Sequence, residues 1–193
     1  MRNGRWGFWN RPWRSWWRPA AWTAVTGWVA YNWAQPIYYD YGGNVYYEDN
    51  SVYIDGNEVS SAEAYAQQIT ELADSVPEDV NADDVEWMPL GVFGLVANEE
   101  EEATMFLQLA VSKEGIIAGT YNNVDTDTAA EVEGMVDNES QRAVWTIGEN
   151  KNTVLETGIY NLTQEETPVL VHFGTDNTQQ WMMVRLEEPE SEQ

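Results

Sequence analysis

The stretch MFLQLAVSKEGIIAGTYNNVDTDTAAEVEGMVD, residues 105–137, decides the fold class, because apolar residues alternate with other residues in its first and last parts. Met105, Leu107, Leu109 and Val111 fall on one face of a strand, and residues 130–136 repeat the alternation with glutamates on the opposite face. The polar sequences SKEG and NVDTDT separate these runs and are typical of turns. The stretch therefore predicts three consecutive antiparallel strands.

The same pattern continues on both sides of this stretch, from residue 86 to residue 188. The expected strands are residues 87–96, 104–112, 116–122, 130–137, 142–147, 153–162, 168–174 and 179–186. Short turns join them, which predicts an up-and-down antiparallel eight-stranded barrel, since closure removes exposed sheet edges. Gly119, Gly134 and Gly158 lie inside strands and indicate strong curvature. A two-sheet sandwich is the alternative.

The residues before the barrel predict a short β-hairpin and one helix. Turn sequences EDNS and DGN separate apolar residues within 37–59, as in a hairpin. Ser60 and Glu63 have the spacing of a capping box, an apolar stripe follows, and Pro77 ends the helix at residue 76. We therefore expect a mainly β protein with the following parts: a leader (1–36), the hairpin and helix (37–76), a linker (77–85), the barrel (86–188) and an acidic tail (189–193).

Charge divides the chain into a basic leader and an acidic remainder. Residues 1–37 hold five Arg and no acid, whereas residues 38–193 hold 33 acidic and four basic residues, a net charge of −29. Such an acidic domain repels nucleic acid, so no nucleic-acid partner is expected. The chain has no Cys, which excludes disulfides, Cys nucleophiles and thiolate metal sites. No apolar run reaches the length of a membrane-spanning helix.

The leader is rich in Trp as well as Arg, with eight of the eleven Trp between residues 5 and 33. Trp and Arg together favour contact with an anionic envelope or membrane surface. The attachment candidates are Arg11, Trp13, Arg14, Trp16, Trp17 and Arg18. The alternatives are a leader with no docking role and a stacking surface for sugars or bases. We expect residues 1–35 to add no packing to the barrel. No signal peptide is evident in this chain, and one is expected upstream.

Catalytic chemistry has little support in the sequence. His172 is the only histidine, and a Ser-His pair would have to use a serine such as Ser112 or Ser140, yet no G-x-S-x-G motif is present. We expect His172 to be a structural residue on the outer face of its strand. The acidic sequences DTDT and EDN (125–128 and 48–50) lack the remaining features of a calcium loop, so neither a metal nor a cofactor is expected.

Glu156 is the carboxylate that draws most attention, because strict alternation places it on one face with Val154, Gly158 and Tyr160. If that face is interior, the carboxylate needs a partner, and Arg185 on the last strand is the obvious one. The candidate pocket then comprises Tyr121, Trp145, Glu156, Tyr160 and Arg185. The alternatives are a bulge that turns Glu156 outward and an ion pair that merely closes the barrel.

Several segments, among them YYDYGGNVYYEDNSVYIDG, EWMPLGVFGLV and WMMVRLEEPE, resemble a family of uncharacterised planctomycete secreted proteins, some of them described as cell-surface or protocadherin-like. The resemblance covers residues 36–189 and implies a secreted, periplasmic or envelope location without an activity. A looser likeness links the meander to avidin and lipocalin-like barrels. We therefore expect a non-enzymatic secreted or envelope-associated binding or structural protein. A barrel that binds a small hydrophobic ligand is the alternative, and an enzyme is the second alternative.

Overall fold

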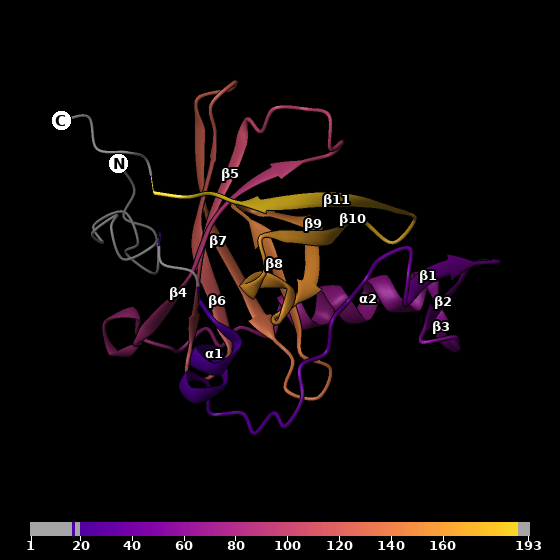
Figure 1. The fold of residues 1–193 in the computed structure, drawn as a ribbon, viewed down its shortest axis with the longest axis horizontal. Coiled ribbons are helices and arrows are strands. Elements are labelled where there is room, and N and C mark those ends of the chain that lie inside the picture. The colour runs from indigo at the N-terminus through magenta and orange to yellow at the C-terminus, as the bar shows by residue number, and fades with distance from the viewer. Residues whose placement is uncertain (1–16, 18–19, 189–193) are drawn as a thin grey trace.

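The computed structural model describes residue 17 and residues 20–188 of the chain (Figure 1). The elements in this part are α1 (Trp22–Trp28), β1 (Val45–Glu48), β2 (Ser51–Ile54), β3 (Asn57–Ser61), α2 (Ala62–Ala73), η3 (Ala82–Asp84), β4 (Trp87–Val96), β5 (Met105–Ser112), β6 (Ile116–Asn123), β7 (Thr128–Val136), β8 (Arg142–Ile147), β9 (Asn150–Gly158), η4 (Asn161–Thr163), β10 (Glu166–Phe173) and β11 (Asn177–Arg185). The mainly β class is confirmed.

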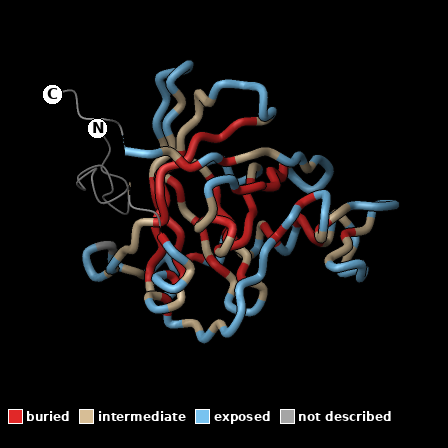
Figure 2. Tube along the Cα trace, in the orientation of Figure 1, coloured by how far each residue is buried: buried red, intermediate tan, exposed pale blue. Residues whose placement is uncertain are grey.

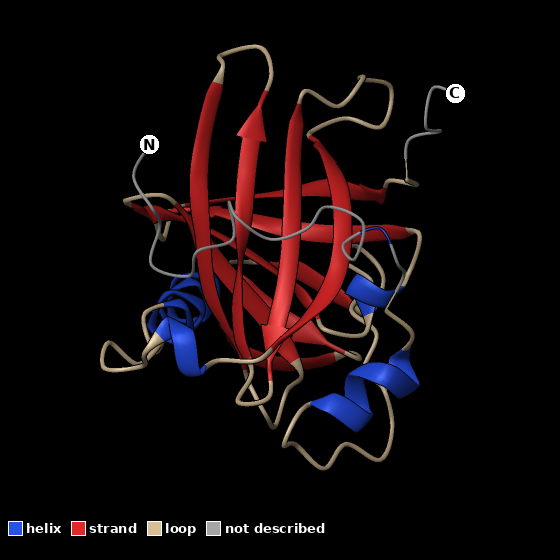
Figure 3. Cartoon of the chain, turned by 90° about the vertical axis from the view of Figure 1, so that its left-hand side faces the viewer, coloured by secondary structure: helices blue, strands red, loops and turns tan. Residues whose placement is uncertain are grey.

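Strands β4 to β11 form a closed antiparallel barrel in which each strand pairs with its neighbours in sequence and β11 pairs with β4. The up-and-down eight-stranded barrel is thereby confirmed, and the helices lie outside its wall (Figure 3). The predicted strand 153–162 is shifted. Ile147 pairs with Asn150 across a two-residue turn that begins at Gly148, so β9 starts earlier, and the chain leaves the sheet after Gly158 to form η4.

Apolar side chains fill the inside of the barrel. Leu107, Leu109, Val132 and Trp145 are all 0% exposed and belong to one interior cluster. Buried residues follow the barrel strands, and exposed residues follow the turns (Figure 2). The faces predicted for residues 105–111 and 130–136 are therefore the interior faces of β5 and β7.

The segment after residue 20 packs against one end of the barrel, so the expectation that residues 1–35 add no packing is wrong for this part. Val25 of α1 is 0% exposed and joins the interior cluster. The indole of Trp28 donates a hydrogen bond to the Val111 carbonyl at 3.1 Å, and that of Trp33 donates to the Asn138 carbonyl at 2.7 Å. Trp22, Val25 and Val29 have helical spacing, a signal that the Trp-rich composition obscured.

Two side-chain amides hold residues 35–41 along the barrel wall. Gln141 accepts from the amide of Ile37 at 2.9 Å and donates to the carbonyl of Gln35 at 2.8 Å. Asn161 makes the same pair of contacts with the backbone of Tyr39, at 3.1 and 2.8 Å. Each amide thus satisfies backbone groups that no strand partner reaches.

The predicted hairpin at 37–59 is a three-stranded sheet, β1–β2–β3. Its two turns have consecutive residues with positive φ, Asp49 with Asn50 and Asp55 with Gly56, the backbone that tight hairpins require. Helix α2 begins one residue later than the capping-box prediction, because the hydroxyl of Ser61 rather than Ser60 accepts from the amide of Ala64.

This small sheet and α2 cover the outer face of β8, β9 and β10. Tyr65 and Ile69 of α2 are each 1% exposed and pack with Val144, Val154 and Leu170 in a second buried cluster. The barrel wall is consequently buried on both faces at this place. The predicted linker 77–85 also packs on the barrel, since Val80 and Val85 contact a third buried cluster that includes Val92 and Ala110.

Candidate functional site

The most unusual feature of the described residues is a group of polar side chains buried between the barrel wall and α2. Alternation in β9 directs Leu155 inward and Glu156 outward, and the outward face is the one that the small sheet and α2 cover. Glu156 is 0% exposed and His172 is 1% exposed. We call Glu156, His172, Arg142, Tyr41 and Tyr65 the Glu156 cluster.

The carboxylate of Glu156 is surrounded by donors. Oε1 accepts from the hydroxyl of Tyr65 and from that of Tyr41, the latter at 3.3 Å. Oε2 lies 2.7 Å from Nε2 of His172, and Nε of Arg142 lies 3.8 Å from Oε1. Because an ionised carboxylate only accepts hydrogen bonds, Nε2 of His172 is the donor. A buried charge persists when it is compensated in this way.

The cluster has a second layer of partners. Nδ1 of His172 lies 3.0 Å from the hydroxyl of Thr178, which fixes the ring in its plane. The guanidinium of Arg142 lies over the ring of Tyr65, 4.8 Å from its centroid, and over that of Tyr39 at 5.6 Å. Strands β8, β9, β10 and β11 are thereby tied to α2 and to the segment before β1.

The electrostatics of the cluster keep its tyrosines neutral. Burial, and then the negative charge of Glu156, raise the pKa of Tyr65 and of Tyr41 well above the ordinary value. Burial alone would lower the pKa of Arg142, but Tyr65 and Glu156 nearby raise it above its ordinary value. The cluster therefore holds one carboxylate and one guanidinium together beneath α2. These contacts connect α2 to the barrel wall.

His172 lies on the outer face of β10, as expected, beside the second buried cluster. Neither serine considered as its partner is bonded to it. The hydroxyl of Ser112 accepts from the backbone amides of Glu114 and Ile116, and that of Ser140 donates to Asp137. The geometry offers no Ser-His pair among these residues.

The predicted pocket residues do not come together. Trp145 lies inside the barrel, Glu156 lies outside it, and Tyr160 packs edge-on against Trp22 with ring centroids 5.4 Å apart. Tyr121 is half-buried against the interior cluster, where its hydroxyl accepts from Asn123 at 3.3 Å. The predicted pocket requires that Glu156 faces inward, and alternation alone does not say which face is inside.

The predicted ion pair between Glu156 and Arg185 is wrong for the same reason. Arg185 donates to the carbonyls of Leu90 at 2.9 Å and Leu162 at 2.6 Å. Gly91, with φ of +144°, leaves the space that the guanidinium needs, because a Cβ there would lie 2.1 Å from Nη1 of Arg185. Backbone carbonyls, rather than Glu156, accept the hydrogen bonds of this guanidinium.

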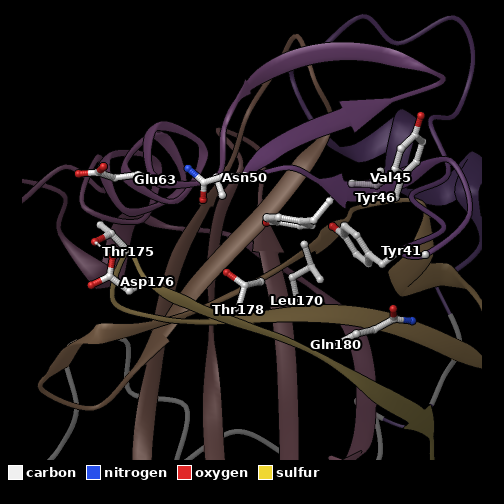
Figure 4. A pocket seen from close by; sticks show the side chains of 13 residues that line it. Tyr41, Val45, Tyr46, Asn50, Glu63, Leu170, Thr175, Asp176, Thr178 and Gln180 are labelled. Atoms are coloured by element: carbon white, nitrogen blue, oxygen red, sulfur yellow. Dashed lines mark hydrogen bonds between the residues drawn. The ribbon is translucent and has the colours of Figure 1, made fainter.

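A pocket of about 640 Å³ lies beside the Glu156 cluster, between the small sheet with α2 and the β10–β11 hairpin (Figure 4). We call it the inter-sheet pocket. It is lined by Tyr41, Gly42, Val45, Tyr46, Tyr47, Asn50, Ala62, Glu63, Leu170, Thr175, Asp176, Thr178 and Gln180. Tyr41 and Thr178 also bond to Glu156 and His172, so the cluster fixes two of its walls. No sequence pattern predicts this pocket, since its walls come from separate elements.

The leader candidates are almost all outside the described residues. Arg11, Trp13, Arg14, Trp16 and Arg18 fall in that part of the chain. Trp17 is described, and it is half-buried against the third cluster on the outer barrel wall. The barrel wall therefore covers part of this ring.

Within residue 17 and residues 20–188, no helix has the length and apolar character needed to cross a bilayer. In the same residues no group of three or more His, Asp or Glu side chains is placed to hold a metal ion. No protein-family model matches the chain, and neither a curated protein nor a solved structure matches it.

Proposed function

We propose that this protein is a non-enzymatic binding protein, secreted or held at the cell envelope, in which the barrel is a scaffold and the inter-sheet pocket is the ligand site. The observation that carries the proposal is the pocket itself, about 640 Å³ with walls from two sheets and a helix. Ligand pockets generally have volumes of about 300–1,000 Å³ and occur where structural units meet.

The placement of the titratable groups supports binding rather than catalysis. Glu156 and His172, the pair that general acid–base chemistry would use, are 0% and 1% exposed and are bonded to each other. A general acid or base must reach a proton of the substrate. The groups that do line the pocket, Glu63 and Asp176 with three tyrosines, are suited to holding a ligand.

A hydrophobic ligand inside the barrel is the alternative, and one observation favours it. The indole nitrogen of Trp145 is buried in the interior without a hydrogen-bond partner. Against this, the surrounding cluster includes Leu107, Leu109, Val132 and Val169, each 0% exposed, so a ligand would have to displace packed side chains.

The experiment is a screen of small cations, anions, sugars and neutral aromatics, read as amide chemical-shift changes by NMR. Binders should perturb residues of the inter-sheet pocket, and Thr175→Trp should abolish the changes by filling it. Thr126→Trp places the same ring on an exposed turn remote from the pocket-lining residues and should leave binding intact. Binders that perturb Trp145 and its neighbours, unaffected by Thr175→Trp, would support the alternative. A screen without binders at millimolar concentration would reject both.

The location rests on the family resemblance, and attachment to a surface rests on the cationic, Trp-rich leader. Fractionation of the native cell should place the protein in the envelope or the medium, and recovery from the cytosol would contradict the proposal. Arg11→Gln with Arg14→Gln should weaken sedimentation with anionic vesicles. Lys113→Gln with Lys151→Gln removes the same charge from the barrel and should not. Equal losses of vesicle binding in the two double variants would argue against attachment through the leader.

A further inference from the structure

The inter-sheet pocket has an uneven distribution of chemical groups. Figure 4 shows Glu63, Asn50, Thr175 and Asp176 at one end, whereas Tyr41, Tyr46 and Gln180 lie at the other. Glu63 comes from the first turn of α2, and Asp176 comes from the turn between β10 and β11. The lining contains no Lys, Arg or His.

Both carboxylates of the acidic end are available to a ligand. Glu63 accepts from the side-chain amide of Gln67 at 3.5 Å, and Asp176 accepts from the hydroxyl of Thr175 at 3.4 Å. Among residue 17 and residues 20–188, the ion pairs involve Glu86 and Glu156 instead. Glu63 and Asp176 therefore contribute two negative charges to the same end of the pocket lining, one from α2 and one from the β10–β11 turn.

The other end supplies the aromatic rings of Tyr41 and Tyr46. Burial, followed by Glu156, raises the pKa of Tyr41, and the same two causes raise the pKa of Tyr47, which also lines the pocket. The hydroxyl of Tyr41 is already bonded to Glu156, so the ring is what remains for a ligand. Neutral aromatic faces attract cations and pack against apolar groups.

From these features we infer that the inter-sheet pocket binds a small organic cation, an amine or quaternary ammonium compound with an apolar body. This inference rests on the proposed function. The cationic group lies between Glu63 and Asp176, and the apolar body lies against the tyrosines. The net charge of −29 on residues 38–193 draws cations toward the site and repels anions.

A bare metal ion fits the pocket less well. Calcium requires six to eight oxygen ligands, usually with several carboxylates close together. No such group of three acidic side chains occurs in the described residues. The aromatic end would also have no role in metal binding, whereas an organic cation uses both ends.

Three probes that share a phenethyl body test the inference by calorimetry and NMR at 150 mM salt: phenethylamine, 2-phenylethanol and 3-phenylpropionate. We expect phenethylamine to bind at least about tenfold more tightly than the alcohol, and the propionate not to bind. Glu63→Gln with Asp176→Asn should reduce the affinity for the amine to that for the alcohol. Asp125→Asn with Glu149→Gln removes two charges from exposed turns and should change the affinity less than twofold.

The outcomes separate this inference from the function on which it rests. If the alcohol or the propionate binds the pocket as tightly as the amine, the pocket is a ligand site but not one for cations. If the Asp125 and Glu149 variant weakens amine binding as much as the pocket variant, the general field of the protein is responsible and the inference fails. If no probe or screened compound perturbs the pocket, the proposed function fails with it.

Discussion

Glu156 connects the barrel wall to α2, because this fully buried carboxylate accepts hydrogen bonds from two tyrosines and His172 and forms an ion pair with Arg142. A sequence can mark such a residue as unusual, since the carboxylate shares a strand face with Val154. It cannot name the partners, because Tyr41 and Tyr65 lie 115 and 91 residues away in the chain.

Glu156→Leu should lower the free energy of unfolding by about 3–5 kcal/mol, because buried His172 would lose its acceptor and Arg142 would lose the opposite charge of its ion pair. Urea denaturation measures the loss. Tyr65→Phe, which removes one donor to a charged group, should cost about 1.5–3 kcal/mol. Glu86→Leu breaks only the exposed pair with Lys113 and should cost about 0–1 kcal/mol. Similar losses at positions 86 and 156 would refute this account of the cluster.

Stability should also fall in alkali because of the buried tyrosines. The pKa of Tyr41 and of Tyr65 is raised in the folded protein above the ordinary 10.0, so the folded state keeps protons that the unfolded state releases. The free energy of unfolding is then unaffected by these groups below about pH 10 and falls above it, by about 1.4 kcal/mol per pH unit for each tyrosine. Urea denaturation between pH 8 and 11.5 should show a shallower decline in Tyr65→Phe, and an identical decline would contradict the assignment.

The curvature of the barrel is a property of its strands, and glycine makes it possible. Gly134 in β7 pairs with Trp145 in β8, and a Cβ on Gly134 would lie 1.8 Å from the carbonyl oxygen of Val144. A Cβ on Gly119 would lie 1.7 Å from the carbonyl oxygen of Gln108. The sequence predicts bending at both residues, and the close approach of the next strand is the physical reason.

Gly134→Ala should therefore destabilise the protein by at least about 2 kcal/mol through overpacking. Gly27→Ala is the matched substitution, because nothing lies within 4 Å of a Cβ at that position in α1. It should stabilise the protein by about 0.5–1 kcal/mol through helix propensity. Thermal and urea melts measure both. Equal effects of the two substitutions would mean that the strands can separate at no cost.

Helix α1 should contribute to stability, contrary to the expectation from composition. Val25→Ala removes two methyl groups from a side chain that is 0% exposed and should cost about 1–3 kcal/mol. Thr23→Ala on the exposed face of the same helix should change the free energy of unfolding by less than about 0.5 kcal/mol. If Val25→Ala is as mild as Thr23→Ala in urea denaturation, α1 does not hold the barrel end.

The whole molecule has a net charge of −24, which opposes folding through self-repulsion. Raising NaCl from 10 to 500 mM at pH 7 should raise the thermal midpoint by a few degrees Celsius, because the screening length falls from about 30 Å to below 8 Å. Calorimetry measures the midpoint. KCl should act equally, since screening depends on ionic strength. An unchanged or lower midpoint would mean that repulsion among the charges does not destabilise the folded state.

Short-range sequence patterns determined the strands of this protein and the order in which they pair. The alternation at residues 105–111 and 130–136, the turn residues and the length of each run were enough to predict eight antiparallel strands and their closure. These features depend on neighbours within a few positions, which the sequence displays directly. Only the tertiary structure decided that the outer wall at Glu156 is covered, that Arg185 binds carbonyls and that the inter-sheet pocket exists. Alternation groups residues by face but does not say what lies against each face, because that depends on contacts between residues far apart in the chain.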